Sequence, residues 1–182
     1  MTNNTPAAKS RARRFALQAL YQVQFAESSA GRVEMQFRQD HDMKRVDTDY
    51  FHDLLTGVMQ SRGALELDLN LILGQETVPD VEAVPATNTE GQVDTEVPGA
   101  AKSEARSMDD LDAVAKAVLL IGAFELQQRI EIPYKVVLNE SIELAKQFGG
   151  AESHRLVNQV LDKMARSNRK AEVEHEASQV QK

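Results

Sequence analysis

The chain of 182 residues contains no cysteine and no tryptophan, and has only five prolines and nine glycines. Without cysteine it can form no disulfide, thiolate zinc site or cysteine nucleophile, which fits a reducing cytoplasm. The longest apolar run, from Val118 to Phe124, is far shorter than the roughly 20 residues that cross a bilayer. The first residues are polar and lack the apolar stretch of a secretory signal. We therefore expect a cytoplasmic protein without a membrane span.

Acidic residues outnumber basic ones by 28 to 21, so the net charge is −7 at pH 7, but this imbalance is local. Residues 75–105 contain seven Asp or Glu and one Lys, and therefore hold −6 of the −7. Attraction to RNA depends on the field at the contact face, so the acidic total argues only weakly against RNA binding. The same segment has three prolines and no aromatic residue, too little apolar surface to offset its ordering entropy. We predict an acidic disordered linker over 75–105.

On both sides of this segment, apolar residues recur at helical spacing. From Lys9 to about Glu27 they form one stripe of a helix, and a short helix is expected over 33–37. Asp47 is expected to cap a third helix, which should break or bend at Gly63, and Ser107 begins a capping-box sequence where helix returns. We predict an all-α chain with four parts: an N-terminal helical subdomain over 1–74, the linker, a C-terminal helical subdomain over 106–168 and a frayed tail over 169–182.

Between Ile132 and Lys163 the pattern predicts two amphipathic helices joined by a glycine turn. Pro133 opens the first helix, where its missing N–H costs nothing. Gly149 is expected to end that helix with a left-handed cap, and Ser153 to cap the second helix. This part is therefore predicted to be a helical hairpin.

One side of the first helix has the residue types that bind nucleic acid. Lys and Arg neutralise phosphates, and a tyrosine beside them can stack on an unpaired base. The same pattern also fits a solvated helix end with an ordinary exposed tyrosine, so both interpretations stay open. The side opposite the apolar stripe carries Arg11, Arg14, Gln18 and Tyr21, with Lys9 and Arg13 nearby.

Catalysis and metal binding find little support in the sequence. Ser153 and His154 are adjacent, and helical neighbours point about 100° apart, so they cannot readily act as nucleophile and base. The histidines lack zinc-ligand spacing, and no glycine-rich phosphate loop precedes a helix. We expect no enzyme activity, no cofactor and no metal site.

Three segments, in order, resemble the NusB family of bacterial transcription antitermination factors. The family is all-helical, with two small three-helix bundles packed together. The resemblance implies that the chain binds the boxA element of ribosomal RNA leader transcripts together with the ribosomal protein NusE, in a complex that helps RNA polymerase resist termination. The segments are Arg11-Ala-Arg-Arg-Phe-Ala-Leu-Gln-Ala-Leu-Tyr21, Tyr50-Phe-x-Asp-Leu-Leu-x-Gly57, and Lys116 to Lys163 with its Pro-Tyr-Lys-Val-x-x-Asn-Glu sequence.

The resemblance also implies which residues contact RNA and which surface contacts NusE. The NusE surface would involve the helices on either side of the linker. From the pattern alone, Phe148 also fits ordinary core packing and Arg155 also fits an ordinary surface charge, so both interpretations of each residue stay open. The RNA-binding residues would be Arg11, Arg13, Tyr21, Phe148, Glu152, Arg155 and Leu156, to which the basic side of the first helix adds Arg14.

Several departures from the family pattern bear on the partners. Ala115 stands where an acidic residue is common, Leu120 where arginine is frequent and Gln159 where glycine is usual, and the linker is longer than the family normally has. One alternative is a protein-interaction module that docks NusE without reading RNA, consistent with the acidic balance. Another is the NusB-like targeting domain of an RNA methyltransferase, but the glycine-rich cofactor-binding domain that should follow is not in this sequence.

Overall fold

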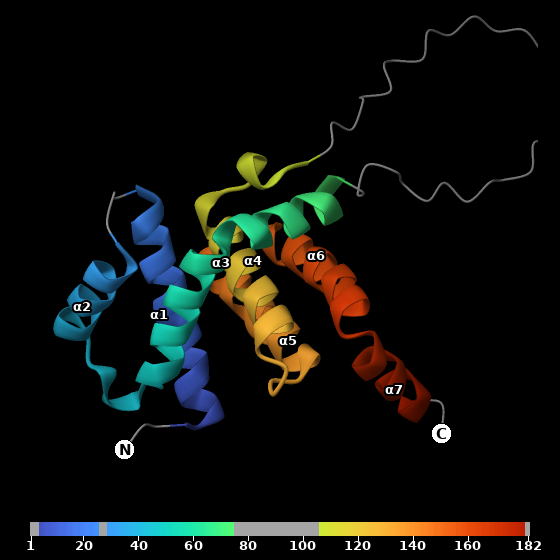
Figure 1. Ribbon diagram of the computed structural model, residues 1–182, viewed down its shortest axis with the longest axis horizontal. Coiled ribbons are helices and arrows are strands. Elements are labelled where there is room, and N and C mark those ends of the chain that lie inside the picture. The colour runs from blue at the N-terminus through green and yellow to red at the C-terminus, as the bar shows by residue number, and fades with distance from the viewer. Residues whose placement is uncertain (1–3, 26–28, 75–105, 181–182) are drawn as a thin grey trace, which may run out of the picture.

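The computed structural model describes residues 4–25, 29–74 and 106–180, and all regular elements within these ranges are helices (Figure 1). The predicted all-α class is therefore confirmed. The segment 75–105, predicted to be a disordered linker, lies outside the described residues. Among the helices that the structure describes, none combines the length and the apolar character that crossing a bilayer would require.

The first bundle is formed by the helices that precede residues 75–105. Asp47 caps its longest helix as predicted, since the carboxylate accepts a hydrogen bond from the backbone N–H of Tyr50 at 3.1 Å. Of the break or bend expected at Gly63, the break is wrong, because α3 runs without interruption from Thr48 to Gly74, although it changes direction along its length (Figure 1). A helical glycine costs only about 1 kcal/mol relative to alanine, which tertiary packing readily overrides. The elements are α1 (Pro6–Phe25), α2 (Ala30–Asp40), a 3-10 helix (Met43–Arg45) and α3 (Thr48–Gly74).

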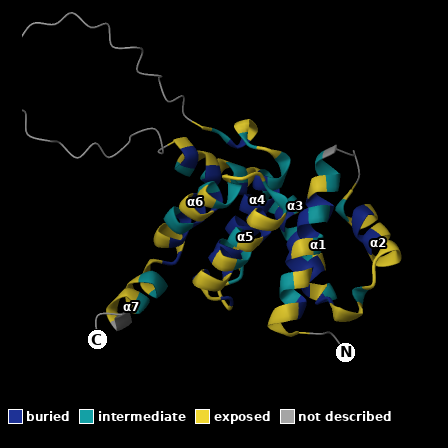
Figure 2. Ribbon diagram, turned by 180° about the vertical axis from the view of Figure 1, so that it is seen from behind, coloured by how far each residue is buried: buried dark blue, intermediate teal, exposed yellow. Residues whose placement is uncertain are grey.

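The second bundle surrounds a central helix, α4. Every residue from Ala117 to Leu126 is buried, and α4 packs against α1, α3, α5 and α6, so it joins the two bundles (Figure 2). Asp112 caps α4 by accepting from the N–H groups of Val114 and Ala115 at 3.0 and 2.9 Å. The capping box predicted at Ser107 is present but begins a short 3-10 helix. The elements are that 3-10 helix (Met108–Asp110), α4 (Ala113–Gln128), α5 (Tyr134–Phe148) and α6 (Ser153–Asn168).

The turn between α5 and α6 differs from the prediction in its detail. Gly149 ends α5 in extended backbone, with φ −90° and ψ 176°, and not in the left-handed region. A Cβ there would lie 2.6 Å from the carbonyl oxygen of Ala145 and 2.9 Å from the Cβ of Ser153. The position therefore needs glycine because two chain segments approach closely. Ser153 does not cap α6, because Glu152 occupies the N-cap position.

The tail predicted to fray from residue 169 forms a further helix instead, α7 (Lys170–Val180). Arg169, between α6 and α7, is buried and donates to the backbone carbonyls of Leu126 and Arg129 at 2.7 and 2.9 Å. These carbonyls belong to the C-terminal end of α4, where intrahelical partners are missing. One buried guanidinium thus anchors the start of α7, and no apolar stripe in the sequence indicates this.

Candidate nucleic-acid interface

Two aromatic side chains that were predicted to contact RNA meet at one apolar hollow between α1 and α5. Tyr21 lies near the end of α1 and is 44% exposed, whereas Phe148 ends α5 and is half-buried. Together with Leu17, Gln18 and Val114 they line a hollow of about 240 Å³. Phe148 also packs against the core, so the two roles considered for it coexist. A hollow with aromatic walls and an apolar base has the chemistry to accept an unpaired nucleobase.

Arg11 and Arg14 lie on the same exposed side of α1, toward its N-terminus. Arg11 makes two long hydrogen bonds, each of 3.4 Å, to backbone carbonyls. Both arginines line a second, smaller hollow together with Glu140 and Glu143 of α5. The two cations therefore lie beside two carboxylates, and the local field is less positive than the sequence of α1 alone indicates.

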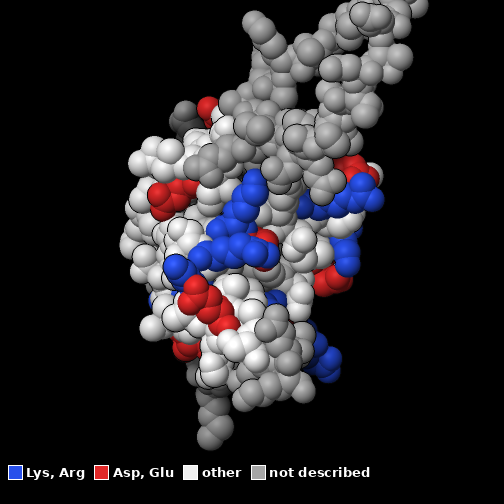
Figure 3. Space-filling view, turned by 90° about the vertical axis from the view of Figure 1, so that its right-hand side faces the viewer, with Lys and Arg blue, Asp and Glu red and all other residues white. Residues whose placement is uncertain are grey.

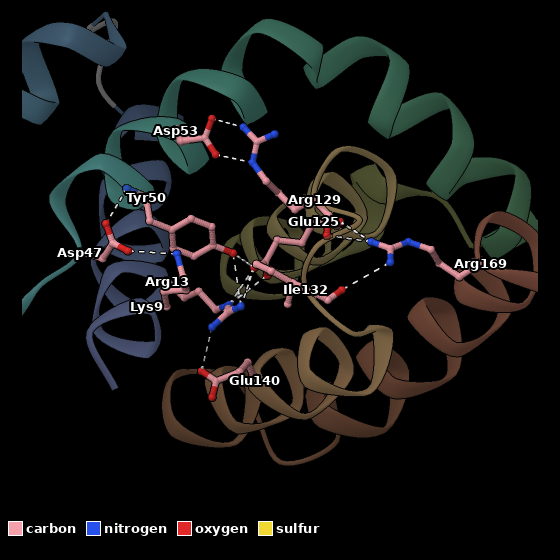
Figure 4. A network of polar contacts seen from close by, with 10 residues as sticks. All are labelled: Lys9, Arg13, Asp47, Tyr50, Asp53, Glu125, Arg129, Ile132, Glu140 and Arg169. Atoms are coloured by element: carbon pink, nitrogen blue, oxygen red, sulfur yellow. Dashed lines mark hydrogen bonds and ion pairs between the residues drawn. The ribbon is translucent and has the colours of Figure 1, made fainter. Parts of the chain in front are cut away.

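Arg13 does not belong to this surface, and the prediction that it lies on the exposed basic side is wrong. It is 2% exposed, and its Nε lies 2.9 and 3.0 Å from the two carboxylate oxygens of Glu125 on α4 (Figure 4). The spacing of the apolar residues in the sequence indicates this burial. Ala16, Leu17 and Leu20 follow Arg13 at i+3, i+4 and i+7, so Arg13 lies on the buried stripe of α1.

Around Arg13 the polar groups form a buried network that joins four helices. The hydroxyl of Tyr50, on α3, donates to Glu125 and accepts from Arg13, and the carboxylate of Glu140, on α5, lies 3.5 Å from the guanidinium. Burial raises the pKa of Glu125, and the nearby charge of Arg13 opposes that shift. Unlike an exposed basic residue, Arg13 thus has its charge compensated inside the protein.

The remaining predicted residues lie at the start of α6. Glu152 and Arg155 form an ion pair at 2.8 Å, with side chains 69% and 74% exposed. Leu156 is half-buried and packs against the core. These three residues follow Phe148 closely in the chain but do not line the hollow that it shares with Tyr21.

The departures from the family pattern at Ala115 and Leu120 lie inside the protein. Both side chains are buried in α4, at 1% and 3% exposure. In this chain the two positions therefore contribute to packing between the bundles and offer little surface to a partner.

Other charged side chains gather on the side of the molecule that carries α6 and α7, where basic and acidic groups lie next to one another (Figure 3). Arg166 pairs with Asp162 at 2.8 Å, and Lys170 with Glu174 at 3.8 Å. Such i, i+4 pairs largely compensate one another, so this side is a weaker RNA-binding candidate than α1. In the described ranges, no group of three or more His, Asp or Glu side chains could hold a metal ion.

Comparison with solved structures supports the fold. "T. maritima NusB, P3121, Form 2" matches with a TM-score of 0.66 over 93% of this chain and 98% of that one, at 21% identity. At this identity, the match shows a shared fold.

Comparison of sequences shows the family. The NusB family model matches residues 93–166. The transcription antitermination protein NusB of Alcanivorax borkumensis is 42% identical over 169 residues, which cover 93% of this chain and 92% of that protein. Its counterpart in Hahella chejuensis is 40% identical over 89% of this chain and 88% of its own length, and that of Acinetobacter baumannii is 39% identical over 91% of each. The chain therefore belongs to the NusB family of transcription antitermination proteins.

Proposed function

We propose that this protein is a non-enzymatic antitermination factor that works in the cytoplasm and binds the boxA element of ribosomal RNA transcripts together with NusE, within the antitermination complex of RNA polymerase. The observation that supports this most is the hollow between Tyr21 and Phe148, with Arg11 and Arg14 on the same side of α1. A stacking site beside cations is what single-stranded RNA requires.

The exposed side of α1 has the length to follow a strand of RNA. Arg11, Arg14 and Tyr21 stand at i, i+3 and i+10, so they span about 15 Å along the helix axis. The arginines would contact phosphates, while the aromatic hollow would hold a base that has left the stack. Glu152, Arg155 and Leu156 would contact RNA from the start of α6, as an extension of the Phe148 end.

The alternative is a module that docks NusE, or another part of the complex, without reading RNA. It is favoured by Glu140 and Glu143, which share the hollow of Arg11 and Arg14 and reduce its positive field.

A fluorescence titration separates these functions. Labelled boxA RNA and a scrambled RNA of equal length are titrated with the protein, with and without NusE. We expect tighter binding of boxA, and a loss of about 1–3 kcal/mol for Tyr21→Leu or Phe148→Leu if each ring stacks on one base. Ile130→Ala, an exposed apolar position elsewhere, is the matched control. Equal binding of both RNAs, with NusE still bound, would favour the docking module.

The salt dependence tests the two arginines separately from the rings. Arg11→Ala and Arg14→Ala should each reduce the log–log slope of affinity against salt by about 0.7, the value for one phosphate contact on single-stranded RNA. Arg166→Ala, on the compensated side, should leave the slope unchanged. If the double variant Arg11→Ala/Arg14→Ala keeps the wild-type slope, α1 does not bind phosphates.

A further inference from the structure

Arg13 adds polar contacts between α1 and three other helices to the apolar packing of α1 (Figure 4). Its Nη2 lies 2.7 Å from Glu125 of α4, and its guanidinium carbon lies 5.4 Å from the ring centroid of Tyr50 on α3. On its other side, Nη1 lies 3.5 Å from Glu140 of α5. One side chain of α1 therefore contacts three other helices.

The partners of Arg13 differ in exposure, and this difference matters for the surface. The Glu125 side chain is fully buried, whereas the Glu140 side chain is 30% exposed. Glu140 also lines the hollow of Arg11 and Arg14. Arg13 thus reaches from the core to the carboxylate that borders the phosphate-binding arginines, and it compensates part of that negative charge.

We propose that Arg13 is a positioning residue for RNA binding, which holds α1 against α5 and engages Glu140 so that the arginines of α1 and the Tyr21–Phe148 hollow form one surface. This role rests on the proposed RNA-binding function. Arg13 itself makes no phosphate contact, because its donors are used by Glu125 and Glu140 inside the protein. Its removal should therefore weaken RNA binding without changing how many phosphates are neutralised.

The test compares Arg13→Met with the double variant Arg13→Met/Glu125→Gln. The single variant leaves the buried carboxylate of Glu125 without its cation, which is strongly destabilising. In the double variant a neutral amide replaces that carboxylate, so the test remains possible if the single variant does not fold. Arg14→Met is the matched control, since it removes the neighbouring exposed arginine.

We expect Arg13→Met to bind boxA RNA roughly 2- to 30-fold more weakly than the wild type, with the same log–log salt slope. The folded double variant should stay weaker than the wild type and keep that slope, because it still lacks the contact to Glu140, whereas Arg14→Met should lower the slope by about 0.7. A slope reduced in the folded double variant would show a direct phosphate contact and overturn the proposal. So would wild-type affinity in Arg13→Met or in the folded double variant.

A distance measurement tests the positioning without RNA. Because the chain has no cysteine, spin labels can be placed uniquely with Ala7→Cys on α1 and Asn139→Cys on α5, both exposed positions. The distance distribution should broaden or shift in Arg13→Met and in the folded double variant, because both lack the contact between Arg13 and Glu140. An unchanged distribution in Arg13→Met would overturn the proposal. If the wild type fails to prefer boxA RNA, the proposed function fails, while this measurement still tests what Arg13 does.

Discussion

Arg13 and Arg14 show how the environment of a residue decides the role of its charge. Arg13→Ala should destabilise the fold by about 3–5 kcal/mol, because it leaves the fully buried carboxylate of Glu125 unpaired. Arg14→Ala changes an exposed residue and should alter stability by no more than about 0.5 kcal/mol. Urea unfolding at pH 7 measures both. Equal stability of the two variants would contradict the buried ion pair.

A second single residue, Glu34 on α2, is expected to make the stability of the fold depend on pH. Burial alone would raise its pKa, but hydrogen bonds from His52 and Arg38 outweigh this and lower it. A lowered pKa means that the folded state binds fewer protons, so this stability is present above the ordinary pKa of glutamate and is lost as pH falls through the folded-state value.

Glu34→Gln should therefore be less stable than the wild type at pH 7, and the difference should shrink toward pH 3. Denaturant unfolding at several pH values measures this. Glu174→Gln is the control, because it removes an exposed i, i+4 partner of Lys170. It should lower the free energy of unfolding by no more than about 0.5 kcal/mol. A difference between Glu34→Gln and the wild type that grows on acidification would contradict the assignment.

At the scale of elements, α6 is held by apolar packing against α4. Leu161 is fully buried and packs closely on Gly122. A Cβ added to Gly122 would lie 2.5 Å from the Cδ1 of Leu161. Leu161→Ala should cost about 2–5 kcal/mol, as measured by thermal or urea unfolding. Arg155→Ala, on the exposed side of α6, should leave the melting temperature near that of the wild type. A large drop in the melting temperature of Arg155→Ala would mean that the assignment of Arg155 to the surface is wrong.

The junction of α6 and α7 depends on polar contacts instead. Arg169 donates to carbonyls at the end of α4 and to Glu172 of α7 at 3.0 Å. Arg169→Gln should leave buried carbonyls without a donor and lower the free energy of unfolding by about 1–3 kcal/mol. Amide hydrogen exchange should then increase in α7 before it increases in α4. Lys170→Gln, an exposed neighbour, is the control. Unchanged exchange in α7 would show that Arg169 is not its anchor.

For the whole molecule, the acidic segment between α3 and the second bundle is predicted to be dispensable. Replacing residues 76–104 with a short Gly/Ser connection should leave both bundles folded and RNA binding intact, because the segment has no apolar stripe. Its carboxylates act on RNA only over a Debye length of about 8–10 Å, so binding at low salt should stay equal or tighten. Circular dichroism and the boxA titration measure the outcome, and unfolding of the shortened protein would contradict the linker assignment.

The sequence by itself determined the helical class, the position of most helices and the family. Apolar spacing carries this information, because a helix must bury one face whatever it packs against. The cap at Asp47 and the hairpin between Ile132 and Lys163 followed from local chemistry. The exposed positions of Arg11, Arg14 and Tyr21 also followed, since they lie opposite the stripe.

Only the tertiary structure decided which polar groups are internal and which side chains meet. Arg13 contacts Glu125 across 112 positions of sequence, and Arg169 donates to carbonyls of α4 that lie 43 and 44 positions away. No local pattern identifies such partners, because a buried charge is acceptable only where a distant group compensates it. The same holds for the hollow of Tyr21 and Phe148. It exists because α4 brings α1 and α5 together, which helical periodicity cannot predict.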